Sequence, residues 1–168
     1  MGTIPQELVT FKSTVSPSLD KMNSTITEIS SKLTDTVSAN NTAKDGVNEY
    51  YNSKNKDAVL EKFTYLNNVY NKINTSISNV LKKMLSDSST IINKVTELES
   101  INKSISEKNQ EISELESDVD NEGNIKNSSR IAELRNEIKI LEDKFEAIKN
   151  ETLGIFTSLK GMDTTITI

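Results

Sequence analysis

The sequence predicts an all-α protein made of elongated antiparallel coiled-coil helical hairpins, in which a long central helix has a shorter partner helix at each end. Apolar residues recur at alternating spacings of three and four in three long runs, and two polar stretches separate these runs. Only five Gly and two Pro occur among the 168 residues. Aromatic residues make up 5% and Trp is absent, so we expect thin seams between helices rather than a thick layered core.

The first apolar run is interrupted by a proline. Its positions are Leu8, Phe11, Val15, Leu19, Met22, Ile26, Ile29, Leu33 and Val37. Because proline has no N–H to donate within a helix, the helix either begins at Pro17, with Ser16 as its N-cap, or kinks there. Residues 40–51 contain a pair of asparagines and Gly46 and lose the periodicity, so they are expected to form a connection.

The second run predicts a central helix from about residue 53 to residue 119, on the order of 100 Å long. Its positions are Phe63, Leu66, Tyr70, Ile73, Ile77, Val80, Met84, Ser88, Ile91, Val95, Leu98, Ile101, Ile105, Ile112, Leu115 and Val119. The step of three from Leu98 to Ile101 is a stammer, which is expected to overwind the supercoil locally. The pattern leaves open whether the helix is continuous across this step.

The third run follows a polar turn at residues 120–124, where Gly and Asn favour a loop. Its positions are Ile131, Leu134, Ile138, Leu141, Phe145, Ile148, Thr152, Ile155, Leu159, Met162 and Ile166. Gly154, Gly161 and the β-branched residues of 164–168 weaken helix propensity, so the sequence does not define where this helix ends.

Both connections are short enough to close antiparallel hairpins. A fold about Tyr50 pairs Leu33 with Leu66, Ile26 with Ile73, and Met22 with Ile77. A fold about residue 125 pairs Val119 with Ile131, Leu115 with Leu134, Ile112 with Ile138, and Ile105 with Phe145. The two partner helices then overlap near Met84 to Val95, where we expect a three-helix section. The predicted domains are a helical hairpin at 1–98 and a coiled-coil hairpin extension at 99–168.

The residue content argues against catalysis. There is no Cys and no His, which removes a Cys nucleophile, a Cys/His zinc site and a His general base. The carboxylates of Glu111 and Glu114 lie on one helical face, where surface ion pairs with Lys108, Arg130 and Arg135 are the expected arrangement. We therefore expect neither an enzyme nor a bound cofactor.

Charge and hydropathy also exclude classes of partner. The net charge is −5, Arg130 and Arg135 are the only arginines, and acids are interspersed with the lysines, so nucleic acid is not an expected partner. No stretch approaches the roughly 20 apolar residues that span a bilayer. Residues 1–20 lack the basic start and the apolar run of a signal peptide, which predicts synthesis in the cytoplasm without a cleaved signal.

The turn at 118–124 offers one candidate for a metal site. Asp118, Asp120 and Glu122 alternate ahead of Gly123, as in the first half of a calcium loop. The twelfth position of such a loop would be Ser129 rather than a bidentate Glu. We therefore expect a solvated polar hairpin tip without a metal.

A set of apolar residues lies beside the main seam of the central helix and widens its apolar face. These residues are Leu60, Tyr65, Val69, Leu81, Leu85 and Ile92. A two-stranded coil leaves one flank of each stripe open to water. This face is therefore predicted to bind another protein chain.

The segment after the first run resembles the turn of the WxG and LxG families, the small helical hairpins that type VII systems of Gram-positive bacteria secrete. Tyr51-Asn52-Ser53 stands where those families carry Trp-x-Gly or Leu-x-Gly, with Ala58 and Phe63 following at helical spacing. The opening Ile4-Pro5-Gln6-Glu7-Leu8 and the spacing of Phe11, Leu19, Ile26 and Leu33 are also similar to theirs. The resemblance covers residues 1 to about 98, with the motif Trp and Gly both replaced and no Tyr-x-x-x-Asp/Glu export signal.

The resemblance implies a helical partner bound side by side, with Tyr51 and Ser53 at the interface. It also implies a role as a secreted substrate or targeting adaptor, found outside the cell or in its envelope. Because the chain lacks the export signal, the partner, another helical hairpin or an LxG-type protein, would supply it. The heptads by themselves support an alternative, a structural subunit of a homo-oligomeric assembly such as a phage particle.

Overall fold

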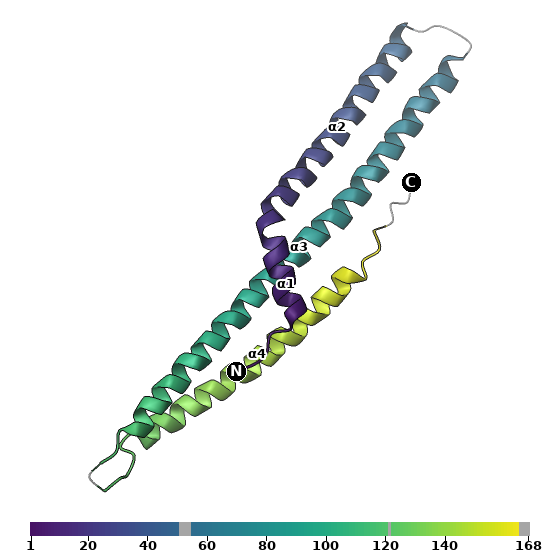
Figure 1. Cartoon of the computed structure of the whole chain (residues 1–168). Helices are drawn as coiled ribbons and strands as arrows, with labels where there is room; N and C mark the ends of the chain where they lie inside the picture. The colour runs from purple at the N-terminus through teal and green to yellow at the C-terminus, as the bar shows by residue number, and fades with distance from the viewer. Residues whose placement is uncertain (51–54, 121, 165–168) are drawn as a thin grey trace. The chain divides into compact units, whose positions relative to one another are not determined.

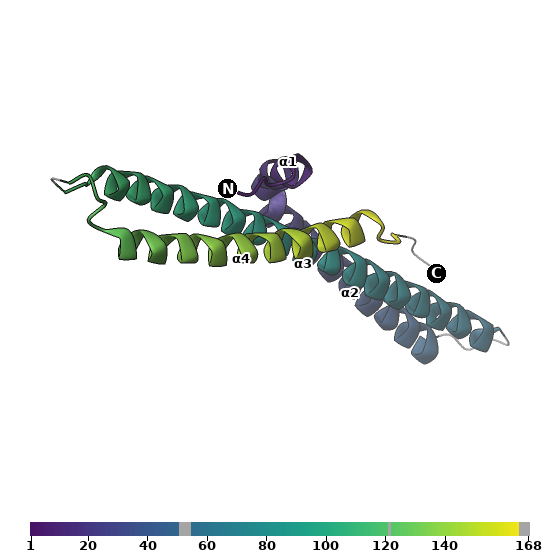
Figure 2. The ribbon, with the colours of Figure 1, turned by 90° about the horizontal axis from the view of Figure 1, so that it is seen from below.

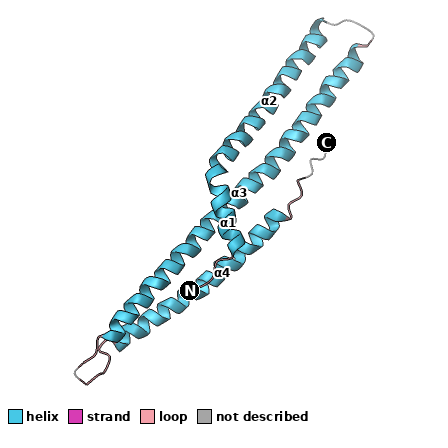
Figure 3. Cartoon of the chain, viewed as in Figure 1, coloured by secondary structure: helices cyan, strands magenta, loops and turns pink. Residues whose placement is uncertain are grey.

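The computed structural model describes residues 1–50, 55–120 and 122–164, and over these residues the chain is all-α as predicted (Figures 1 and 3). The elements in order are α1 (Gln6–Val15), a short 3-10 helix (Ser16–Ser18), α2 (Leu19–Tyr50), α3 (Lys56–Ser117) and α4 (Ser128–Lys160). The long central helix is α3, with 62 residues. It is continuous through the stammer, and Leu98, Ile101 and Ile105 are all buried there.

The chain divides into two compact units, and α3 contributes to both. Unit 1 contains Met1–Ser16 and Asp87–Gly161, and unit 2 contains Pro17–Ser86 and the chain after Gly161. This division differs from the predicted boundary at residue 98. The reason is that α1 packs on the second half of α3 together with α4, so it belongs with those helices and not with α2.

Proline 17 separates α1 from α2. The residues before it are helical, so the first helix does not begin there. Instead the α-helical hydrogen-bond pattern gives way to a 3-10 turn at Ser16–Ser18 and resumes at Leu19. This agrees with the interruption that the missing proline N–H predicts.

In unit 1, α4 runs beside the second half of α3 (Figures 1 and 2). Three buried clusters follow the seam between them. The first holds Ile112, Ile131 and Leu134, the second Leu98, Ile101, Ile105, Phe145 and Ile148, and the third Leu8, Ile91, Val95 and Phe156. The third cluster joins α1, α3 and α4, which places a three-helix section at Ile91–Val95, inside the range that the sequence predicts.

The predicted register of this second hairpin is confirmed except at its tip. Ile105 shares a cluster with Phe145, and Ile112 and Leu115 share one with Leu134 and Ile138. The pairing of Val119 with Ile131 is wrong, because α3 ends at Ser117 and Val119 forms an isolated antiparallel bridge with Ile125. The β-branched valine thus belongs to the turn, where it is 45% exposed.

In unit 2, α2 pairs with the first half of α3, and the predicted connection at 40–51 is wrong over residues 40–50, while residue 51 lies outside the described residues. Residues 40–50 continue α2, because their polar side chains bond to α3. The amide of Asn40 donates to Oδ1 of Asn67 at 2.6 Å, and Nζ of Lys44 donates to the hydroxyl of Thr64 at 2.9 Å. Polar residues that look like a loop in the sequence therefore form part of the helix seam.

The longer α2 also changes the register. The hydroxyls of Ser30 and Ser78 lie 3.0 Å apart, and Ile26 shares a groove with Leu81. The predicted pairs Leu33 with Leu66, Ile26 with Ile73, and Met22 with Ile77 are therefore wrong by about two helical turns. Placing the turn at Tyr50 caused this error, since the helix reaches that residue.

The two units differ in how deeply they bury their apolar side chains. Among the described residues from Pro17 to Ser86, only Ile26 is buried, at 6% exposure. Asn74 adds a buried Oδ1 that has no hydrogen-bond partner among the described residues. Unit 2 is therefore a thin hairpin with a mixed polar and apolar seam. Along the described chain, none of the helices is long and apolar enough to cross a membrane.

Candidate protein-interaction surface

One strip of α3 in unit 2 faces away from α2. We call it the outer strip; it consists of Lys62, Tyr65, Val69, Lys72 and Ser76. These positions follow spacings of three and four, so they form a single stripe along the helix. Tyr65 and Val69 each lie two residues from Asn67, the residue that bonds to α2, so they lie about 200° around the helix from the seam.

The outer strip is partly apolar and open to solvent. Tyr65 is 64% exposed and Val69 is half-buried. A shallow groove runs along the strip, and its lining residues are Tyr65, Asn68, Val69, Asn71, Lys72, Thr75 and Ser76. A second, more apolar groove lies nearer the start of α3, on the opposite flank of the strip. Its lining residues are Asn55, Ala58, Val59, Lys62, Phe63 and Leu66.

This part of α3 is also basic. Between Glu61 and Asp87 the sequence carries Lys62, Lys72, Lys82 and Lys83 and no acid. The expectation that acids are interspersed with the lysines overlooked this stretch of the chain. Within the described parts of the chain, Lys62, Lys72 and Lys82 form no ion pair.

The structure divides the residues that the sequence predicts for partner binding. Tyr65 and Val69 lie on the outer strip, but Leu60, Leu81 and Leu85 lie whole turns away from Asn67 and so belong to the side that faces α2. Leu81 lines an apolar groove there with Met22, Ile26 and Ile29 of α2.

Two further groups of predicted residues do not join this surface. Ile92 is buried at 9% exposure in unit 1, so it is not available to a partner. Its neighbour Ile91 belongs to the cluster that joins α1, α3 and α4, and the heptad pattern could not show this third helix. Tyr51 and Ser53 lie outside the described residues.

The lysines and arginines of unit 1, in contrast, largely find carboxylates on neighbouring helices. Lys12 of α1 lies 2.6 Å from Glu99 of α3, and Lys94 of α3 lies 2.6 Å from Glu151 of α4. Lys144 lies 2.8 Å from Glu97. These cross-helix pairs fit the antiparallel register and leave unit 1 with most of its charges matched.

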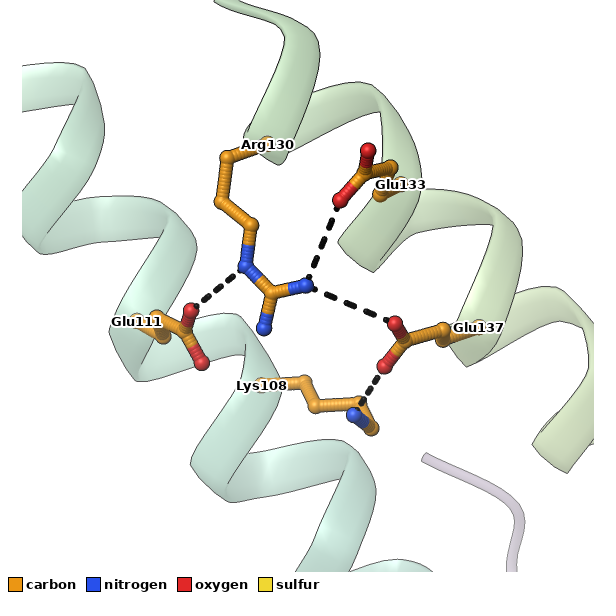
Figure 4. Close-up of polar contacts among 5 residues, drawn as sticks. All are labelled: Lys108, Glu111, Arg130, Glu133 and Glu137. Carbon is orange, nitrogen blue, oxygen red and sulfur yellow. Dashed lines mark hydrogen bonds and ion pairs between the residues drawn. The ribbon is translucent and has the colours of Figure 1, made fainter. Parts of the chain in front are cut away.

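The densest group of charges joins α3 and α4 near the hairpin tip (Figure 4). Arg130 lies 3.1 Å from Glu111 and 3.6 Å from Glu137, which also contacts Lys108. The hydrogen bond from Lys108 lowers the pKa of Glu137, and the hydrogen bond to Glu111 raises the pKa of Arg130. These groups are half-exposed and charged at neutral pH, so they form a surface ion-pair network as predicted.

The other predicted ion pairs differ in their partners. Arg135 lies 2.7 Å from Glu116, and Glu114 accepts a hydrogen bond from Gln110 of its own helix. The paired carboxylates of Glu111 and Glu114 therefore do not share a site, and each is matched separately.

The acidic turn uses its carboxylates to hold its own backbone. Asp120 accepts hydrogen bonds from the backbone N–H of Glu122 at 2.8 Å and of Asn124 at 2.9 Å. Asp118 is bonded to Lys126 and Asn127. Gly123 has φ +84°, which permits the tight turn between them. In the described part of the chain no three Asp or Glu side chains gather closely enough to hold a metal ion.

Comparisons of the chain with protein-family models, with curated proteins and with solved structures find no match. The assignment of a function therefore depends on the geometry and chemistry of the outer strip.

Proposed function

We propose that the chain is a non-enzymatic protein-interaction module that binds a helical partner protein along the outer strip of α3. The observation that carries this proposal is the exposure of Tyr65, a large aromatic side chain that is 64% exposed beside Val69 on a regular helix face. Aromatic residues contribute much of the binding energy of protein interfaces when a partner covers them. The heptad spacing of the strip matches the side-by-side packing of two helices.

We further propose that this module serves type VII secretion, as a substrate or as a targeting adaptor. The resemblance of Tyr51-Asn52-Ser53 and of the opening residues to the WxG and LxG hairpins supports this assignment. The pairing of α2 with α3 as an antiparallel helical hairpin is consistent with it. In this role the partner would supply the missing export signal.

Photo-crosslinking tests the interaction. Tyr65 is replaced by p-benzoyl-phenylalanine in the organism that encodes the chain, and adducts are identified by mass spectrometry. We expect one protein to be captured, with the crosslink confined to one predicted helix of that protein. The matched control carries the same group in place of Ile140, which is 60% exposed in unit 1.

Equal adduct yields from positions 65 and 140, or adducts formed only between copies of this chain, would contradict the proposed function. The identity of the captured protein tests the secretion assignment separately. A component or substrate of a type VII system supports it, and an unrelated partner refutes it while leaving the interaction itself intact.

A further inference from the structure

We propose that the partner of the outer strip is an acidic amphipathic helix, with carboxylates on both sides of a narrow apolar stripe. This inference rests on the proposed function and adds the chemistry of the partner. It is carried by the placement of lysines beside the two grooves of α3, together with the charge of this part of the chain.

The apolar part of the strip is small. Tyr65 and Val69 are its apolar members. The second groove, which includes Val59 and Leu66, lies closer to α2 than the strip does. Leu66 is 40% exposed. A stripe of this width fits one helix, which would place its own apolar residues on Tyr65 and Val69 and leave its flanks near the lysines.

The lysines define the chemistry of those flanks. Lys62 lines one groove and Lys72 lines the other, ten positions apart along the helix, or about 15 Å. Both side chains are exposed, and neither forms an ion pair with the described residues, whereas lysines of unit 1 such as Lys12 and Lys94 do. A partner helix lying along α3 can satisfy both with carboxylates about three turns apart.

A second copy of the chain is a poor occupant of this strip. Two-fold pairing of identical strips would bring the lysines of one copy near those of the other, since the same surface patch forms both sides of such an interface. Like charges facing each other oppose association. The charge of the strip therefore favours a different, acidic chain.

Nucleic acid and anionic lipid fit less well. Residues 56–86 contain no Arg, and the whole chain has a net charge of −5, which repels a polyanion that extends beyond the strip. A helix that inserts into a lipid surface needs a broad apolar face with large side chains, and the outer strip offers Tyr65 and Val69 between polar residues.

Charge reversal tests the inference in the crosslinking experiment at position 65. We expect the double variant Lys62→Glu/Lys72→Glu to lower the adduct yield by about tenfold, because two attractive charges become repulsive. The matched control is Lys139→Glu, which reverses an exposed lysine of unit 1 and should leave the yield unchanged. Circular dichroism should show the same helicity for all variants, since the three side chains are exposed.

The crosslinked segment of the partner provides the second readout. We expect this segment to carry Asp or Glu residues on both flanks of its apolar stripe. In the chain that keeps both lysines, the adduct yield should fall as the salt concentration is raised. An adduct that survives charge reversal, or a segment with basic flanks, overturns this inference and leaves the proposed function standing. The absence of any adduct at position 65 overturns both.

Two binding controls address the other polyanions. The wild-type chain is mixed with vesicles that contain phosphatidylserine and, separately, with duplex DNA. We expect no retention on either. If the wild-type chain is retained on either polyanion and the Lys62→Glu/Lys72→Glu variant is not, the outer strip binds that polyanion and the inference is overturned.

Discussion

The side-chain amide of Asn102 on α3 pairs with both backbone polar groups of Gly2. The N–H of Gly2 donates to Oδ1 of Asn102 at 3.2 Å, and Nδ2 of Asn102 donates to the carbonyl of Gly2 at 2.9 Å. The next apolar residue, Ile4, packs against the second and third buried clusters of unit 1, around Phe145 and Phe156. This reciprocal pair therefore fixes the N-terminal segment on unit 1 ahead of α1.

We predict that Gly2→Ala destabilises unit 1 by roughly 1–3 kcal/mol, because a Cβ at this position would overlap the ring of Phe145. Asn102→Ala should have an effect of about 1–3 kcal/mol, since it leaves both backbone groups of Gly2 without their partner. Chemical denaturation measures both changes.

Gly154→Ala is the matched control for this prediction. Apart from its chain neighbours and the backbone of its own helix, no atom lies within 4 Å of a Cβ built at Gly154, which is inside α4. The substitution should therefore stabilise the protein by roughly 0.5–1 kcal/mol, because alanine favours a helix over glycine. If Gly2→Ala raised stability as Gly154→Ala does, the close packing on Phe145 would be incorrect.

A second prediction concerns the unpartnered amide in the seam of unit 2. Asn74→Leu should raise the melting temperature, because it removes a buried acceptor without a donor and adds apolar surface beside α2. The expected gain is about 1 kcal/mol. Asn79→Leu, at an exposed position of the same helix, should give no such gain. A lower melting temperature for Asn74→Leu would indicate that the amide is satisfied in solution.

The acidic turn should respond to pH. Hydrogen bonds from the backbone of Asn124 and then of Glu122 lower the pKa of Asp120. Its folded pKa lies below the unfolded value, so its contribution to the turn is present above the unfolded pKa and is lost as pH falls through the folded pKa. We expect the amide proton shifts of Glu122 and Asn124 to titrate together below about pH 4.

Asp120→Ala provides the control for the pH prediction. It should abolish that joint titration and leave the amide shifts of the α3–α4 seam near Ile105 unchanged. Titration of the two amides at the ordinary pKa of an aspartate would show that the carboxylate does not accept these bonds.

Hydrogen exchange should separate the two units. Ile26 is the one buried residue among those described from Pro17 to Ser86, whereas residues such as Ile91, Val95 and Leu98 of unit 1 have no exposed surface. Amides of α2 and of residues 56–86 should therefore exchange faster than those of residues 91–112, because local opening exposes less apolar surface in unit 2. Equal protection along α3 would show that its two halves open together.

Much of unit 1 follows from the sequence. The spacing of Ile105, Ile112, Leu134 and Phe145 identifies two helices, and the Gly123 turn between them is tight enough to set their register. Charged residues beside the seam, such as Glu111 and Arg130, agree with the same register. Short-range signals suffice here because the partner helices are close in sequence and the turn chemistry is distinct.

Unit 2 could not be derived in the same way. Asn40, Asn41 and Gly46 have the composition of a loop, yet all three lie within α2. The contacts of Asn40 and Asn41 with α3 accompany this continuation of the helix. The register of a hairpin depends on where its turn begins, so an error there moves every pair, including Ile26 with Ile73. The sequence assigns Tyr65 and Leu81 to one apolar face. In the structure, Leu81 lies on the side of α3 that faces α2, and Tyr65 lies on the outer strip.

By itself, the sequence determined that the chain forms long helices paired in antiparallel order, because heptad spacing is a local property of each helix. The tertiary structure alone decided which sides of each helix are not covered by another helix. It buried Ile92 within unit 1 and left Tyr65 exposed between Lys62 and Lys72. The physical reason is that a side chain's exposure depends on helices distant in sequence, whose placement follows from packing and not from periodicity.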